Sequence, residues 1–298
     1  EYRSINGFAS SSPIRPASKS PVGVAGPDSK SEDLTGWIRA YGGVGSKDAD
    51  KNFAEYDTSM IGTIIGIDKS FERMLVGIAG GFSAANVDAG SAYDVDVKSF
   101  NGSLYATYGG ESVFVDAAFT AGFMDTEAKN IIIEDKFNSY ALSGYIGAGK
   151  SFLPTESLKL TPEASVQVSY YAQEEYDRGG ITAKTIEEYD TTTVLSSIGF
   201  NLATAGYLDL GLAIVPEFRL HWLHDFNADP EDFSYTIDGG GRYTFGVRPR
   251  DEDLARVGFG LDIWSWKRLH SRLELDYDAL LSDKYREHII SGKITRKF

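Results

Sequence analysis

Cysteine is absent from the 298 residues of this sequence. Its absence excludes a disulfide framework, a thiolate nucleophile and a thiolate metal site. Basic residues are scarce as well, since 29 Lys and Arg stand against 43 Asp and Glu and leave a formal net charge of −14. Nucleic-acid-binding domains carry a basic surface, so this balance argues against a nucleic-acid partner. The acidic excess is compatible with a protein of the cell surface.

Long apolar runs are also missing. The densest apolar stretch, MIGTIIGI at 60–67, is far shorter than the ~18 residues that predict a membrane-spanning helix. The sequence opens without the basic and apolar regions of a secretory signal, so an exported protein would need a longer precursor. These absences fit a soluble protein. They fit an outer-membrane barrel equally well, because each strand of such a barrel is only half apolar.

Two regions of different composition make up the chain. Residues 1–33 are rich in Ser, Pro and Gly, with prolines at positions 13, 16, 21 and 27. Proline at this spacing prevents a continuous helix, so we expect a linker or a pore-threading segment. Residues 34–298 are rich in Gly and aromatic residues, which favours many strands joined by tight turns. We expect this second region to form one β-domain.

From residue 34 onward, apolar and polar residues alternate with a period of two, which predicts β-strands. Most of the twelve alternating segments are long enough for a tilted crossing of a bilayer. The segments are residues 35–45, 56–69, 74–87, 96–109, 112–125, 138–152, 158–173, 189–203, 208–226, 254–266, 269–282 and 287–298.

The connections between these segments alternate in length. The short ones are residues 71–74, 109–112, 153–157, 203–207 and 267–269, and the longer ones are residues 46–55, 88–95, 126–137, 174–188 and 227–253. Short periplasmic turns and longer extracellular loops are typical of outer-membrane barrels. The pattern therefore predicts an all-β fold, a transmembrane antiparallel β-barrel of 12 strands. A soluble β-sandwich would also alternate, but Phe298 directly after a strand suits a membrane interface better.

Several stretches resemble the autotransporter β-domain, the translocator of type V secretion. The resemblance covers about residues 34–298 and is most specific near the end, with one departure at Arg296, where the family usually has an apolar residue. The matching stretches are GWIRAYGGVG at 36–45, with Trp37 and Arg39 in the matching places, PEFRLHWLHDF at 216–226, VGFGLDIW at 257–264, LELDYDALL at 273–281 and the last strand ending in Phe298.

The resemblance implies a translocator domain that exports and anchors an N-terminal passenger at the surface of a Gram-negative-type bacterium. It implies no enzyme activity and no cofactor. The implied partners are the passenger upstream of residue 1, outer-membrane lipid and the barrel-assembly machinery, for which Phe298 would be an assembly signal. Three alternatives stay open: a passive outer-membrane porin, an outer-membrane hydrolase with a site in the outer loops, and a soluble β-sandwich.

Charged residues of both signs share the predicted inner face, which suggests a hydrated, salt-bridged lumen. Such a lumen suits the passage of an extended polypeptide, although barrel interiors are polar in any case, and both interpretations stay open. The predicted lumen-lining residues are Arg39, Glu163, Glu217, Arg219, Asp262, Arg272, Glu274, Asp276 and Lys293.

The sequence predicts no catalytic, cofactor-binding or metal site. His221 and His224 are three positions apart, which places them on opposite faces of a strand. The HDF stretch at 224–226 offers an Asp/His pair of the kind that a protease would use, but acidic loops also serve as solvated surface. No GxSxG nucleophile elbow is present, as a lipase of the common type would need.

Overall fold

The computed structural model describes residues 34–49, 53–71, 73–90, 93–109, 112–129, 134–178, 184–204, 206–208, 212–228, 232–237, 241–246, 250–265 and 271–298. The predicted linker or pore-threading segment, residues 1–33, lies outside the described residues. No helix in these ranges is long and apolar enough to cross a membrane.

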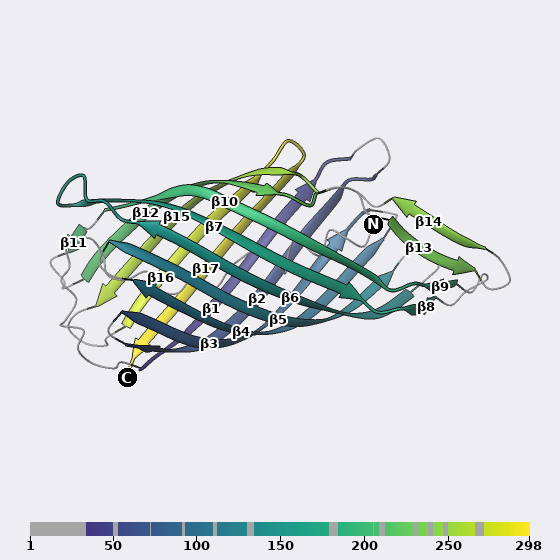
Figure 1. The fold of residues 1–298 in the computed structure, drawn as a ribbon, viewed down its shortest axis with the longest axis horizontal. Helices are drawn as coiled ribbons and strands as arrows, with labels where there is room; N and C mark the ends of the chain where they lie inside the picture. Colours follow the sequence, from purple (N-terminus) through teal and green to yellow (C-terminus); the bar gives the residue numbers. More distant parts are fainter. Residues whose placement is uncertain are drawn as a thin grey trace.

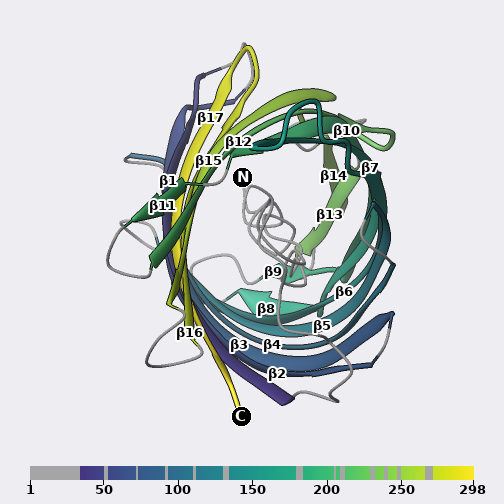
Figure 2. The same ribbon diagram turned by 90° about the vertical axis from the view of Figure 1, so that its left-hand side faces the viewer.

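Twelve long antiparallel strands form the wall of a barrel (Figure 1). Consecutive long strands pair with each other, and β1 pairs with β17, so that the ring is closed (Figure 2). The prediction of a 12-stranded antiparallel barrel is confirmed. The strands are β1 (Leu34–Lys47), β2 (Tyr56–Ser70), β3 (Met74–Asp88), β4 (Asp94–Gly109), β5 (Val113–Lys129), β6 (Glu134–Lys150), β7 (Leu158–Gln173), β10 (Tyr189–Thr204), β12 (Leu212–Asp225), β15 (Asp253–Ser265), β16 (Ser271–Leu281) and β17 (Tyr285–Lys297).

The strand bounds follow the alternation closely where one face is apolar. β7 has the predicted bounds, and the predicted segment 208–226 begins later, at Leu212, after the short strand β11 (Gly206–Leu208). The predicted loop 126–137 is mostly strand, because β5 continues to Lys129 and β6 already starts at Glu134. Its alternation is polar on the outward face, where Glu127 pairs with Lys129 and Lys136. A search for alternating apolar residues therefore does not detect the strand ends within residues 126–137.

Four short strands inside two predicted loops form a separate sheet, in the order β14-β13-β9-β8. Figure 1 shows this outer sheet beyond the ends of the barrel strands, at the end where the longer connections lie. We name this end the long-loop end and the opposite one the short-turn end. The strands are β8 (Tyr176–Arg178), β9 (Lys184–Ile186), β13 (Asp232–Ile237) and β14 (Arg242–Gly246).

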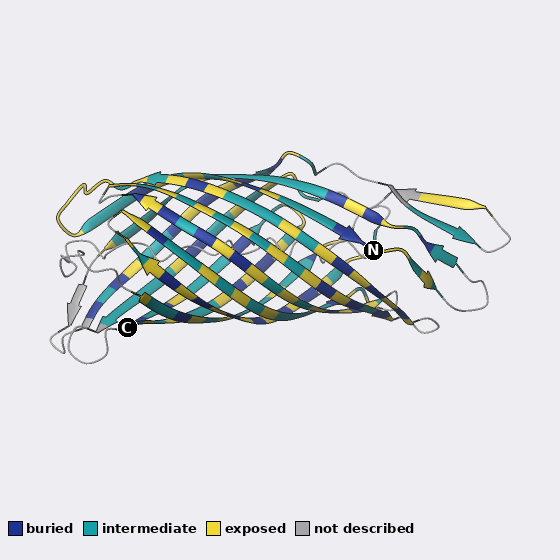
Figure 3. Ribbon diagram, turned by 60° about the horizontal axis from the view of Figure 1, so that its bottom comes forward, coloured by how far each residue is buried: buried dark blue, intermediate teal, exposed yellow. Residues whose placement is uncertain are grey.

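The outward face of the barrel wall is apolar and exposed. Ile61, Leu104 and Ile290 keep 68%, 60% and 66% of their surface accessible. Exposed and less exposed residues alternate most regularly along β2 and β5 (Figure 3), as the period of two requires. An apolar band of this kind suits contact with lipid hydrocarbon.

The inward face packs aromatic rings against glycines. The ring of Trp37 lies over Gly66 on the neighbouring strand, so that a Cβ at Gly66 would sit 2.4 Å from its Cζ2. Trp37 Nε1 donates hydrogen bonds to Tyr105 Oη at 2.8 Å and to Asp68 Oδ1 at 3.1 Å, and Tyr105 also donates to Asp68. The ring of Tyr105 in turn lies over Gly77. These contacts join β1, β2, β3 and β4 inside the wall.

Candidate functional site

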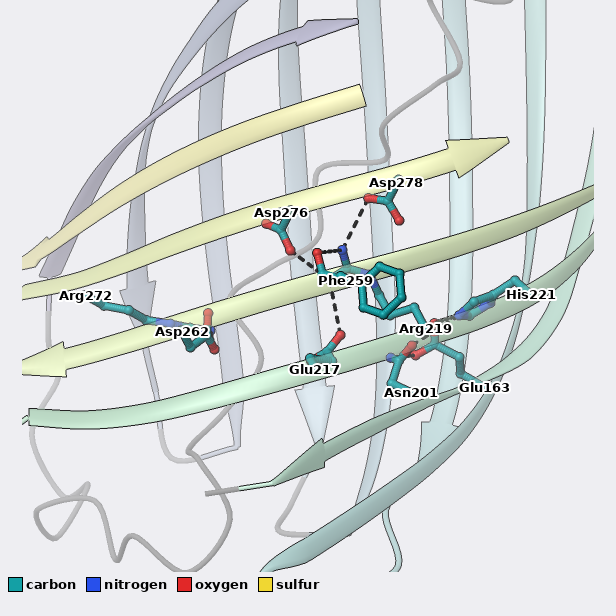
Figure 4. Close-up of polar contacts among 10 residues, drawn as sticks. All are labelled: Glu163, Asn201, Glu217, Arg219, His221, Phe259, Asp262, Arg272, Asp276 and Asp278. Carbon is teal, nitrogen blue, oxygen red and sulfur yellow. Dashed lines mark hydrogen bonds and ion pairs between the residues drawn. The ribbon is translucent and has the colours of Figure 1, made fainter. Parts of the chain in front are cut away.

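The inner wall at β12, β15 and β16 is organised around one arginine (Figure 4). Arg219 on β12 is 9% exposed and pairs with three carboxylates. Its Nη1 lies 2.7 Å from Asp276 Oδ1 and 3.3 Å from Glu217 Oε1, and its Nη2 lies 3.3 Å from Asp278 Oδ2. Charge-assisted hydrogen bonds of this kind are among the stronger ones. Arg219 therefore joins β12 to β16 across the strand between them.

Glycines on β15 make this crossing possible. A Cβ at Gly258 would lie 2.8 Å from Arg219 Nε, and one at Gly260 would lie 3.0 Å from Arg219 Nη1. The first contact is closer than real Cβ contacts and the second is at the tight limit, so a side chain at either position would push the guanidinium from its present place. Arg219 Nη2 also approaches the main-chain oxygen of Phe259 at 3.4 Å.

A second charged group lies on β15, β16 and β17. Arg272 pairs with Asp262, and its Nε lies 3.1 Å from Glu274 Oε1. Lys293 Nζ lies 3.6 Å from the same Glu274 oxygen and 5.0 Å from the ring centre of Trp37. Lys293 is 3% exposed, and Arg39 stands directly opposite it in the β1–β17 pairing. This group joins the last strands of the barrel to the first.

Glu163, the remaining residue of the predicted lumen set, belongs to a third group on β7, β10 and β12. Asn201 Nδ2 donates to Glu163 Oε2 at 2.9 Å, and His221 Nε2 lies 3.1 Å from Asn201 Oδ1 and 3.4 Å from Glu163 Oε1. His221 Nδ1 lies 3.3 Å from Ser197 Oγ. Gly199 stands between Glu163 and His221 in the register, and its missing side chain leaves room for the imidazole.

The nine predicted residues thus fall into three groups rather than one site. Glu217, Arg219 and Asp276 meet at the first group, while Asp262, Arg272, Glu274, Lys293 and Arg39 lie in the second. The predicted lumen set omits Asp278, Asn201 and His221. Asp278 continues the even-numbered polar series of its strand, so alternation places it on the same face as Asp276. Asn201 and His221 are uncharged at neutral pH, and a search for charged residues passes over them.

His224 lies on the other face of β12 from His221, at the long-loop end. Its Nδ1 is 3.0 Å from Asp253 Oδ1, and Trp222 Nε1 donates to the same oxygen at 2.9 Å. Ser196 stands directly opposite His224 in the β10–β12 register. Within the described ranges, no group of three or more His, Asp or Glu side chains is arranged to hold a metal ion.

The outer sheet is attached to the barrel through β6. The rings of Phe137 on β6 and Tyr176 on β8 stack with centres 4.8 Å apart, and Arg178 pairs with Asp135. Burial raises the pKa of the Tyr176 hydroxyl above its usual range. These contacts fix the sheet at one side of the long-loop end.

Phe298 lies against the first strand at the short-turn end. Its main-chain N–H donates to the oxygen of Leu34 at 2.9 Å, and a Cβ at Gly36 would lie 3.0 Å from its ring. The side chain is otherwise open, with 74% of the residue exposed, and the Arg296 guanidinium lies 5.9 Å from the ring centre. The ring is thus available to a partner outside the barrel.

Comparison with known proteins gives a family match over most of the chain. The model of the family described as "Autotransporter beta-domain" matches residues 36–278. An extracellular serine protease of Serratia marcescens is 22% identical over 282 residues, which are 91% of this chain and 27% of that protein. The chain thus spans about a quarter of the length of the curated relatives that it matches.

Solved structures share the fold at low sequence identity. The translocator domain of the autotransporter NalP from Neisseria meningitidis has a TM-score of 0.72 and 14% identity, over 89% of each chain. The transport unit of AIDA-I from Escherichia coli has a TM-score of 0.69 and 12% identity, over 92% of this chain and 93% of that one. The β-domain of the Bordetella autotransporter BrkA has a TM-score of 0.67 and 18% identity, over 90% of this chain and 100% of that one.

Proposed function

This chain belongs to the autotransporter β-domain family, and from that premise we propose how its barrel serves export. It is an outer-membrane translocator domain for an N-terminal passenger. We propose that the passenger precedes residue 1, that residues 1–33 link it to the barrel or thread the lumen, and that the barrel anchors it at the cell surface. Transport in this scheme needs no enzymatic step.

The closed wall with opposite chemistry on its two faces carries this proposal. Outward residues such as Ile61 and Leu104 are apolar and exposed, which suits lipid. Inward residues such as Arg219 and Arg272 are ionised but paired with carboxylates. A transport path must bind its cargo weakly enough to let it leave. Ion pairs within the wall satisfy one another, so they leave a polar surface that does not hold a passing polypeptide.

We propose two further partners. Outer-membrane lipid surrounds the apolar band, and the barrel-assembly machinery binds the last strand through Phe298. The accessible ring beside β1 supports the second proposal, because β1 and β17 are the strands whose pairing closes the barrel.

The export function can be tested by attaching an epitope upstream of Glu1, behind a secretory signal. We expect antibody to label the epitope on intact cells. An epitope that stays in the periplasm while the barrel is inserted would contradict the proposal.

Conductance in planar bilayers distinguishes a translocator from a porin. A porin conducts ions at a high level with or without residues 1–33. If residues 1–33 occupy the lumen, their removal should raise the conductance of the translocator.

A further inference from the structure

Three polar residues form a row across neighbouring strands on the outward face of the wall. Ser196 on β10 is directly opposite His224 on β12, and His224 is directly opposite Asp253 on β15. Side chains that stand directly opposite each other in an antiparallel pair have Cβ atoms about 4.5–5.5 Å apart. A serine, a histidine and an aspartate are therefore neighbours, in that order, although they come from distant parts of the sequence.

The hydrogen bonds orient the histidine as a base. His224 Nδ1 lies 3.0 Å from Asp253 Oδ1, and a carboxylate at Nδ1 keeps the proton on that nitrogen. Nε2 then carries the lone pair. Glu252 Oε1 lies 3.8 Å from Nε2. Nucleophilic serines are activated by a base that a third group orients in this way.

Ser196 contacts the residue that carries this base. Its Oγ donates to the main-chain oxygen of His224 at 3.4 Å, so the hydroxyl already lies on the side of β12. A rotation about χ1 moves Oγ from that oxygen toward the imidazole ring. Geometries of this kind are often looser before a substrate binds.

The surroundings of the row fit an acyl chain. Trp222 and Phe226 flank His224 and are 52% and 65% exposed, while Ile198 and Val166 flank Ser196 and are 58% and 41% exposed. Trp222 and Phe226 lie at the long-loop end of β12, whereas Ile198 and Val166 lie about midway along β10 and β7. Tryptophan is enriched at membrane–water interfaces, the level at which lipid ester bonds lie.

We propose that Ser196, His224 and Asp253 form an ester-hydrolysing site on the outer wall of the barrel. Its substrates are fatty-acyl esters of the surrounding leaflet. Ser196 and His224 are the catalytic residues, and Asp253 is a positioning residue that acts through His224. The site is separate from the lumen and does not depend on transport.

The reaction balances without a cofactor. Ser196 Oγ bonds to the acyl carbonyl carbon while its proton passes to His224 Nε2. The ester C–O bond breaks, and the leaving alcohol takes the proton from His224. Water then attacks the acyl-serine, again giving its proton to His224. The fatty acid leaves, and Ser196 regains its proton.

The first test uses the purified 298-residue chain in detergent and a fluorophosphonate probe, which phosphonylates an activated serine and releases fluoride. We expect one adduct per chain, mapped to Ser196 by peptide mass. His224→Gln should slow labelling by about 10²- to 10⁴-fold. The matched control is Ser197→Ala, because Ser197 is the next residue but faces the lumen beside His221, and its loss should leave labelling unchanged. An adduct at Ser197, or equal labelling of the parent and His224→Gln, would overturn the proposal.

The second test measures fatty acid released from vesicles that contain the barrel. One set holds phosphatidylethanolamine and the other lipopolysaccharide, so the set that releases acid identifies the source of the ester. Ser196→Ala serves as the blank, and heat-dependent gel mobility shows that each variant has folded. Asp253→Asn should lower the rate and Asp253→Glu restore it in part, at equal thermal stability. If the parent chain releases no more fatty acid than Ser196→Ala in either set of vesicles, the proposed site is wrong.

Discussion

Glycine and its large neighbours define the inner wall at the scale of single residues. Trp37 occupies the space that Gly66 leaves open, and Arg219 occupies the space above Gly258 and Gly260. In each case a ring or a guanidinium crosses a neighbouring strand and contacts it along its length. The glycines therefore make room for the large side chains. The loss of stability on replacing a glycine depends on which side chain packs over it.

Gly66→Ala should destabilise the barrel, because its Cβ would lie 2.4 Å from the Trp37 ring. Overpacking of this kind costs about 1–3 kcal/mol. The measurement is the free energy of unfolding in urea, with gel mobility as the probe. Gly102→Ala is the matched control, since no heavy atom lies within 4 Å of its Cβ. Equal effects of the two substitutions would contradict the packing that we describe.

Arg219→Met should destabilise the barrel more strongly. It leaves Glu217, Asp276 and Asp278 close together without their shared cation. Removing one partner of a buried pair costs about 3–5 kcal/mol. Adding Asp276→Asn and Asp278→Asn removes the repulsion, so the triple variant should unfold at a higher urea concentration than Arg219→Met alone. A triple variant as unstable as the sum of its single substitutions would show that the groups do not interact.

At the scale of elements, each long strand has one face toward lipid and one face toward the hydrated lumen. The outward face of β7 carries Val166 and Val168, which are 41% and 45% exposed, while Ser165 and Gln167 face inward. A strand of this kind is stable only where both solvents are present. Beyond the apolar band the outward face becomes charged, as Glu127 and Lys136 show on β5 and β6.

The two faces of β7 should respond differently to a positive charge. Val168→Arg places a cation against lipid, which costs about 2–4 kcal/mol near the midplane. Ser165→Arg places the same side chain in the lumen and should change the free energy of unfolding far less. Folding into lipid vesicles at a series of urea concentrations measures both. If the two variants fold with the same midpoint, the assignment of the faces is wrong.

At the scale of the whole molecule, closure gives each of the twelve long strands a paired neighbour on both sides. β1 pairs with β2 on one side and with β17 on the other, so both chain-terminal strands of the barrel are in the ladder. A closed barrel pairs the backbone groups that face lipid internally. Closure is completed only when the last strand meets the first, and Phe298 lies at that junction.

Phe298→Ala should lower outer-membrane abundance in cells much more than stability. The ring is 74% exposed, so its loss from the folded barrel should cost less than about 2 kcal/mol. The experiment compares the amount inserted in cells with the unfolding of purified protein. Phe152→Ala is the control, since Phe152 is an exposed aromatic residue on the β6–β7 connection. Equal abundance of both variants would remove the assembly role of Phe298.

Alternation by itself predicted an all-β chain and the number of long strands, and it divided each strand into two faces; the connection lengths and Phe298 were needed to favour a membrane barrel over a soluble sandwich. Alternation could divide the faces because a period of two is a local property: Leu160 and Val166 share a face wherever β7 is placed. It determined strand ends less well where the outward residues are polar, as at Lys129 and Glu134. The short strands β8, β9, β13 and β14 escaped detection, since three to six residues carry too little periodicity.

Only the tertiary structure decided which side chains meet. Arg219 and Asp276 are 57 positions apart, and their contact depends on the register of β12, β15 and β16 and on the glycines between them. The row of Ser196, His224 and Asp253 depends on the same kind of register across β10, β12 and β15. Parity assigns a residue to a face, but a shift of two residues along a strand preserves parity and changes every neighbour. Register is set by pairing along the whole ring, and that is a property of the closed barrel.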